Sequence, residues 1–226
     1  MRWDASCVPP HTIISADGTT ASHSKSAWGT VRGDEVFSTG VVEIDIGCPN
    51  VDNCSLFLGV AEHTFFEHLT AAEQEEEEHL PRDSKHAICI HGDGRVFIKA
   101  AEKEWGLMRV ATGDPVNITL DFDKGVITFR LSRTVRGKDK ETIAEVPGLF
   151  RSGVRLICCF GGRDQEVSIT RCDVRDTGDS RQRRVRDVFA DAMGEYIAPV
   201  AFSAPQQAQT YEQQIIDMAK TLETSN

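Results

Sequence analysis

The sequence predicts an all-β protein, a two-layer sandwich of bent antiparallel sheets. About a dozen short apolar stretches are separated by Gly, Pro, Asn and Asp, which is typical of strands joined by tight turns. No long helical pattern precedes residue 180. One pair of these stretches, in the middle of the chain, has the spacing of a β-hairpin.

The clearest strand pattern lies between residues 113 and 131. Apolar side chains occupy every second position from Val116 to Phe122 and again from Ile127 to Leu131, with polar ones between them. Asp123-Lys124-Gly125 separates the two runs and is typical of a hairpin turn, in which Gly125 takes a left-handed conformation. Because an isolated hairpin is not stable in water, these two strands are expected to lie within a larger sheet.

The first part of the chain contains four more expected strands. They cover His11–Ser15, Ala27–Val31, Val36–Ile46 with an interruption at Gly40, and Ser55–Ala61. The last of these is almost entirely apolar, which is typical of a strand buried on both faces.

The following segments contain another hairpin and a charged excursion. Ala87–His91 and Arg95–Lys99 flank Gly92-Asp93-Gly94, a strong hairpin pattern. The charged residues from Val135 to Glu141 predict an exposed loop, and Thr142–Val146 predicts a short strand.

The strand pattern then closes and the composition changes. Val154–Phe160 is apolar, Gly161-Gly162 predicts a turn, and Glu166–Thr170 alternates. We therefore expect a sandwich over residues 1–175, followed by a linker and a C-terminal helix over residues 176–226.

The longest insert between strands runs from Glu62 to Lys85. It contains the pair Phe65-Phe66 and an acidic run, and Ala71–Leu80 has room for one or two helical turns. The acidic run lacks apolar periodicity, so we interpret it as a solvated loop face, with attraction of a basic partner as the alternative.

Charge and hydropathy exclude several classes of protein. The net charge of −10 and pI of about 5.2 disfavour direct binding to nucleic acid. No run of about 18 apolar residues exists, so no membrane span is expected. The seven cysteines form no Cys-x-x-Cys pair, which favours reduced thiols and a cytoplasmic or nuclear location. A disulfide between Cys48 and Cys54 is the alternative.

No motif for catalysis or metal binding stands out. Five of the seven histidines lie between His63 and His91, but their spacing is not that of zinc ligands. A Gly-x-Ser-x-Gly elbow is absent, and Gly161-Gly162-Arg163 lacks the lysine and helix of a phosphate loop. We expect no enzyme activity, no cofactor and no metal.

The order of these segments resembles a SPRY domain of the PRY-SPRY class. Five segments carry the resemblance, over about three quarters of the chain: Phe37–Ile44, Leu58–Ala61, Ile90–Val96, Gly113–Leu131 and Cys158–Ile169. The chain departs from the family pattern at two points. Val41-Val42 stands where an aromatic pair is usual, and Ser132-Arg133 stands where Asn-Gly is usual.

The resemblance implies a concanavalin-like, jelly-roll type of sandwich that recognises a peptide or a partner loop through loops at one rim. It further implies an adaptor role in a ubiquitin-ligase, chromatin or RNA-processing complex. By analogy the rim would use Ser24, Lys25, Trp28, Phe65, Phe66, His68, Phe160, Gly161 and Gly162. A core role for Trp28, and a local core role for one or both of Phe65 and Phe66, are the alternatives.

Three other hypotheses remain at this point. A carbohydrate-binding sandwich would use exposed aromatic platforms, yet the chain has only 3 Trp and 2 Tyr. The basic patch at residues 181–186, with four arginines, could serve an RNA-associated subunit. An amphipathic helix over residues 206–224 would pack on the sandwich, on a partner or on a second copy of the chain.

Overall fold

The computed structural model describes residues 1–51, 55–66, 81–103, 106–150 and 152–176. The chain divides into two compact units, Met1–Arg183 and Arg184–Asn226, and the described residues all belong to the first. The second unit lies wholly outside the described residues, as do the helices expected over residues 71–80 and 206–224 and the basic patch at 181–186.

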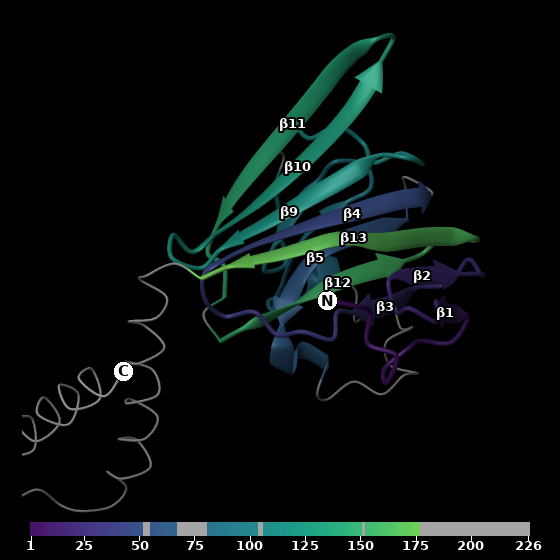
Figure 1. Cartoon of the computed structure of the whole chain (residues 1–226), viewed down its shortest axis with the longest axis horizontal. Coiled ribbons are helices and arrows are strands. Elements are labelled where there is room, and N and C mark those ends of the chain that lie inside the picture. The colour runs from purple at the N-terminus through teal and green to yellow at the C-terminus, as the bar shows by residue number, and fades with distance from the viewer. Residues whose placement is uncertain (52–54, 67–80, 104–105, 151, 177–226) are drawn as a thin grey trace, which may run out of the picture. The chain divides into compact units, whose positions relative to one another are not determined.

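Two antiparallel sheets form the sandwich that the sequence predicts (Figure 1). The seven-stranded sheet has the order β1 (Thr12–Ile14), β2 (Thr20–His23), β13 (Gln165–Arg175), β4 (Val41–Asn50), β9 (Pro115–Asp121), β10 (Val126–Val135) and β11 (Lys138–Pro147). The six-stranded sheet has the order β3 (Gly29–Arg32), β12 (Val154–Phe160), β5 (Leu56–Glu62), β6 (Ala87–His91), β7 (Val96–Ile98) and β8 (Ala101–Lys103). Two short 3-10 helices, η1 (His63–Phe66) and η4 (Pro81–Asp83), flank the undescribed part of the insert after β5.

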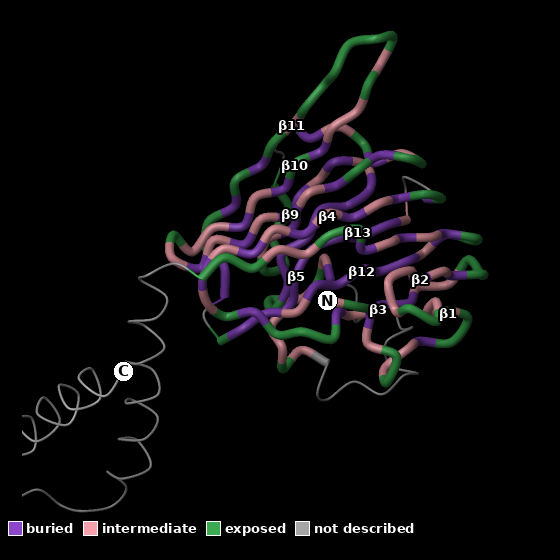
Figure 2. The backbone as a smooth tube through the Cα atoms, in the orientation of Figure 1, coloured by how far each residue is buried: buried purple, intermediate pink, exposed green. Residues whose placement is uncertain are grey.

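The main core lies between the sheets and follows the alternation seen in the sequence. Ile44, Ile118 and Phe129 are paired across β4, β9 and β10, and all three are fully buried. Figure 2 shows buried and less buried residues alternating along these strands. Burying each such side chain contributes roughly 1.5–3 kcal/mol. The predicted hairpin is confirmed, and Gly125 has the expected positive φ of 68°.

Gly40 marks the point where the chain passes from one sheet to the other. Phe37 forms an isolated bridge to Val154 in the six-stranded sheet, whereas β4 begins at Val41 in the seven-stranded sheet. Gly40 has φ of 76°, and a Cβ there would lie 2.5 Å from the carbonyl oxygen of Arg175. The strand is interrupted where the chain changes sheets, and the close approach of Arg175 leaves no room for a side chain at position 40.

The six-stranded sheet is buried on both faces along β5, as its apolar sequence predicts. Leu56, Leu58 and Val60 belong to the main core, while Phe57 and Ala61 are buried on the outer face. On that face η4 packs against β6 and also touches β5, β7 and β8. Gly59 allows strand β6 to lie close, because a Cβ there would be 2.2 Å from the carbonyl oxygen of Ile88.

The loop predicted over residues 135–141 is wrong. Strands β10 and β11 pair without interruption from Val126 with Pro147 to Val135 with Lys138, and Arg136 and Gly137 form the turn with positive φ. Figure 1 shows this hairpin extending beyond the neighbouring strands. Its outer part is exposed, so backbone hydrogen bonds hold it and no apolar alternation marks it in the sequence.

Within the described residues, no helix is long and apolar enough to cross a membrane.

Candidate functional site

The loop between β2 and β3 is anchored by a buried histidine at its start. His23 lies 2.8 Å through Nε2 from the carbonyl oxygen of Ala27, so Nε2 carries the hydrogen and donates it. In the neutral ring the Nδ1 atom then accepts from the hydroxyl of Thr12, at 2.8 Å. The His23 ring stacks on Phe160 with 5.7 Å between ring centroids. Both ends of the five-residue loop Ser24–Trp28 are thus tied to the sandwich.

The loop presents three exposed residues and one half-buried aromatic ring. Ser24, Lys25 and Ser26 are exposed. The Trp28 ring packs on Phe57, with 5.6 Å between ring centroids, and lies directly against Gly161. This packing agrees in part with the alternative of a core role for Trp28, but the ring keeps an exposed part.

A cluster of rings continues from Trp28 across the outer face of the six-stranded sheet. Phe57 contacts His91 at 4.7 Å and Phe97 at 5.8 Å between ring centroids. The Arg95 guanidinium lies 5.7 Å from the centre of the Phe97 ring and forms an ion pair with Asp93 at 2.8 Å. Burial alone would raise the pKa of Asp93, but the neighbouring His91 and Arg95 outweigh it and the pKa is lowered. The edge of the cluster therefore carries charge while its centre is apolar.

Phe65 lies on the same face but at a distance from Trp28. It is half-buried in η1 and packs against Ala61, Ala87 and Ile157. Ala61 is four residues along β5 from Phe57, which corresponds to roughly 13 Å. This agrees with a local core role for Phe65. The side chain of Phe66 and the whole of His68 lie outside the described residues.

The structure corrects the role of Phe160. This side chain is fully buried in the main core between the sheets, so it cannot contact a partner of the folded chain. The next two residues form a fixed turn, because the N–H groups of Gly161 and Gly162 lie 3.2 and 2.9 Å from Oε1 of buried Gln165. Gly162 is buried as well, which leaves Gly161 beside Trp28.

Of the rim residues predicted from the sequence, the structure brings Trp28 and Gly161 into contact, and Ser24 and Lys25 are exposed on the same loop as Trp28. We call these four residues the Trp28 surface. Four residues of the ring cluster lie under or beside the Trp28 surface: Phe57, His91, Arg95 and Phe97. They were not predicted as site residues, because no local pattern in the sequence marks them.

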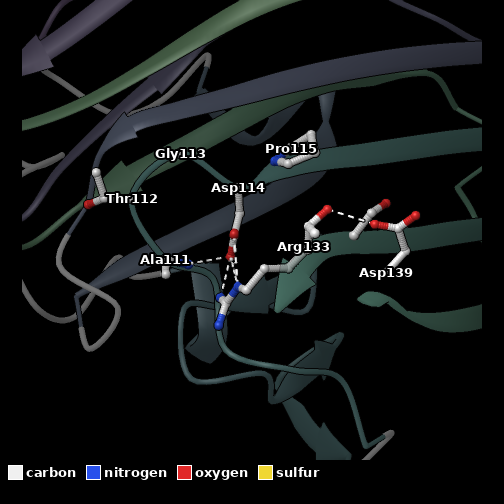
Figure 3. Close-up of a pocket in the computed structure, with 9 residues that line it drawn as sticks. Ala111, Thr112, Gly113, Asp114, Pro115, Arg133 and Asp139 are labelled. Carbon is white, nitrogen blue, oxygen red and sulfur yellow. Dashed lines mark hydrogen bonds and ion pairs between the residues drawn. The ribbon is translucent and has the colours of Figure 1, made fainter. Parts of the chain in front are cut away.

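A cavity of about 570 Å³ lies away from the Trp28 surface, at the N-terminal end of β9 (Figure 3). Its lining comes from residues 111–115, from residues 132–134 of β10, and from Asp139 of β11. Sequence reasoning missed this site, because its two halves are about twenty positions apart and share no motif.

An ion pair forms one wall of the cavity. The Nε atom of Arg133 donates to both carboxylate oxygens of Asp114, at 2.9 and 3.0 Å, and Nη2 donates to the carbonyl oxygen of Arg109 at 2.6 Å. The hydrogen bond to Asp114 raises the pKa of Arg133. Asp114 is buried and also accepts from the N–H of Ala111 at 2.8 Å. Arg133, one of the departures from the family pattern, thus ties β10 to the loop before β9.

The buried thiols offer no reactive group. Cys48, Cys89, Cys158 and Cys159 are free and buried, and Cys54 lies outside the described residues. Burial raises the pKa of Cys48 and of Cys159 to about 12, so neither forms a thiolate near neutral pH. Among the described residues, no group of three or more metal-ligating side chains comes together.

Comparisons with known proteins identify the architecture. The SPRY domain of human HERC1 superimposes with a TM-score of 0.57 at 13% identity, covering 77% of this chain and 99% of that domain. The PSpry domain of TRIM65 gives a TM-score of 0.54 at 11% identity, covering 75% and 91%. Stonustoxin gives 0.54 at 10% identity, covering 74% of this chain and 26% of that one.

The class of protein that this architecture defines is a two-sheet antiparallel β-sandwich. Its particular form is that of the SPRY domains, so the fold implied by the resemblance in the sequence is confirmed. No family model matches the chain, and no curated protein sequence matches it.

Proposed function

We propose that this chain is a non-catalytic protein-interaction module that binds a peptide or a partner loop at the Trp28 surface. The observation that carries the proposal is the position of the Trp28 ring. The ring packs on Phe57 and lies against Gly161, yet Trp28 remains partly exposed next to the exposed residues of its own loop. A rigid aromatic ring in such surroundings has the properties of a binding hot spot.

The chemistry of the surroundings suggests which partner fits. Lys25 is exposed on the loop, and the side chain of Arg95 is 42% exposed at the edge of the ring cluster. An apolar side chain of the partner would cover Trp28, and a neighbouring acidic group would approach Lys25. The net charge of −10 disfavours nucleic acid as the direct ligand.

The role we propose is that of an adaptor within a larger complex, such as a ubiquitin ligase or a chromatin or RNA-processing assembly. The free thiols support a reducing compartment, the cytoplasm or the nucleus. Residues 206–224 would serve contact with a partner or with a second copy of the chain, and light scattering with and without residues 205–226 tests the second of these.

The binding surface is tested with two substitutions and one matched control. Trp28→Ala removes the ring and Lys25→Glu reverses the charge, whereas Ile143→Ala removes an apolar side chain that is 43% exposed on β11 in the other sheet. Partners are captured from cells with the intact chain, and each one is then purified and assayed by direct binding.

We expect both substitutions at the Trp28 surface to weaken binding by about tenfold or more, equivalent to about 1.4 kcal/mol, and Ile143→Ala to have no effect. Melting curves of the three variants show whether each one is folded. If a folded Trp28→Ala variant binds every purified partner as tightly as the unmodified chain, the proposed surface is wrong.

A further inference from the structure

Strand β10 continues past the end of its neighbour β9. The last pair between them joins Leu131 to Val116, whereas β10 runs on to Val135 and remains paired with β11 on its other side. Within the described parts of the chain, no strand pairs with the β9-facing edge of Ser132–Val135. Along an antiparallel strand alternate residues direct their N–H and C=O groups to each side, so this edge offers free backbone donors and acceptors.

The cavity of about 570 Å³ lies beside this free edge. Its volume falls within the range of roughly 300–1,000 Å³ found for ligand sites in proteins. The side chain of Arg133 does not fill the space, because Asp114 and the carbonyl oxygen of Arg109 hold its guanidinium (Figure 3). Gly113 leaves further room, since a Cβ there would meet no atom within 4 Å.

The charges of the cavity favour a cationic group. The positive charge of Arg133 is matched by Asp114. Asp139 is exposed, and its Oδ1 accepts from the hydroxyl of Thr134 at 2.7 Å. No basic side chain of the described residues forms an ion pair with Asp139, so its charge is the unmatched one in the lining.

We propose that this cavity, the β10 cleft, binds an extended segment of a partner protein. The segment adds a short strand to β10 beyond the end of β9 and places a Lys or Arg side chain against Asp139. Main-chain hydrogen bonds to a free strand edge supply affinity, and the charged contact supplies selectivity. This site belongs to the seven-stranded sheet and shares no residue with the Trp28 surface, whose Trp28 ring packs on Phe57 of the six-stranded sheet.

A library of random peptides displayed on phage, selected on the intact chain, tests the proposal. Peptides that are enriched are synthesised, and their affinities are measured by fluorescence anisotropy. Ser132→Trp fills the cleft and Asp139→Lys reverses its charge. Thr128→Trp, on the same face of β10, and Glu145→Lys, on β11, place the same groups outside the cleft and serve as matched controls.

We expect an enriched class of peptides with Lys or Arg between strand-forming residues. Their affinity falls about tenfold or more in Ser132→Trp and in Asp139→Lys, and is unchanged in both controls and in Trp28→Ala. Hydrogen exchange of the intact chain with a bound peptide shows added protection in Ser132–Val135.

Three results would overturn the β10 cleft as a peptide site. They are the absence of any enriched peptide, enriched peptides that bind Ser132→Trp with unchanged affinity, and enriched peptides without basic residues. Peptides lost only in Trp28→Ala support the Trp28 surface and count against the cleft, so the two proposals fail separately. If Ser132→Trp does not fold, Asp139→Lys decides the outcome, because Asp139 is exposed on the hairpin.

Discussion

Trp28 lies so close to Gly161 that a Cβ at position 161 would be 2.5 Å from Cζ3 of the indole ring. The absence of a side chain at position 161 therefore determines where the ring can lie. The ring packs on Phe57 on one side and on the Gly161 backbone on the other, and the turn at Gly161 is held by Gln165. Trp28 is thus placed by two segments that are far apart in the sequence.

Gly161→Ala is expected to displace the Trp28 ring without unfolding the chain. The added methyl group overlaps the ring, which is half-buried and can rotate outward, whereas the backbone of β12 is fixed. Tryptophan fluorescence and near-ultraviolet circular dichroism should change, and binding of the partner should weaken about tenfold. Gly125→Ala is the control, because it introduces strain in a turn of the other sheet and leaves Trp28 in place. Unchanged spectra and unchanged binding in Gly161→Ala would show that the ring position does not matter.

Apolar periodicity predicted the strands that bury a side chain at every second position. Strands β4, β9 and β10 have this pattern because one face of the sheet covers the core and the other meets water. The outer part of β11 has no such pattern, since Lys138–Glu141 are exposed and are held by backbone pairing with β10 and by polar side-chain contacts such as that of Thr134 with Asp139. A charged segment of this kind is predicted to be a loop from its composition. Its pairing with a neighbouring strand can be recognised only from the three-dimensional structure.

The candidate sites were harder to predict than the fold, because they join residues distant in the sequence. Trp28 and Gly161 both stood out, one as a large ring in a polar loop and the other as part of a Gly pair. Phe160 stood beside that pair but faces the core, and alternation alone could not show which face of β12 covers the other sheet. Asp114 and Arg133 meet because β9 and β10 are neighbours: Val116 pairs with Leu131, and the same register places Asp114 opposite Arg133.

Phe160→Ala is expected to destabilise the chain by about 3–5 kcal/mol, because it leaves a cavity between the sheets. The change also removes the ring on which His23 stacks. Phe65→Ala should cost about half as much or less, since Phe65 is only half-buried on the outer face. Urea unfolding followed by circular dichroism measures both. If both variants lost only a small and equal amount of their free energy of unfolding, the assignment of Phe160 to the core would be contradicted.

The buried thiols are expected to resist alkylation in the native chain. Burial raises the pKa of Cys48, Cys89, Cys158 and Cys159, and the thiolate is the reactive form. Iodoacetamide at mildly alkaline pH should label Cys7 and Cys172 before these four, because both are only half-buried. Peptide mass spectrometry locates the label, and the same reaction in urea gives the fully accessible control. Rapid native labelling of Cys158 or Cys159 would mean that β12 opens readily.

Acid stability should depend in part on Asp17, in the turn between β1 and β2. The Ser15 hydroxyl and the N–H and hydroxyl groups of Thr19 donate to its Oδ1 at 2.6, 3.0 and 2.9 Å, which lowers the pKa of Asp17 from 3.8 to about 2. Because the folded state holds the ionised form, this contribution to stability is complete above pH 3.8 and is lost as the pH falls to about 2.

The variant Asp17→Asn has no titrating group at this position. As the pH is lowered from 3.8 to about 2, its unfolding midpoint in urea should therefore decrease less than that of the unmodified chain. Ser15→Ala removes the donor with the largest effect on the pKa of Asp17, and its pH dependence should lie between the other two. The comparison isolates one carboxylate, because every other acidic group is common to the three proteins. Parallel curves for all three down to pH 2 would show that these hydrogen bonds do not favour the ionised form of Asp17 in the folded chain.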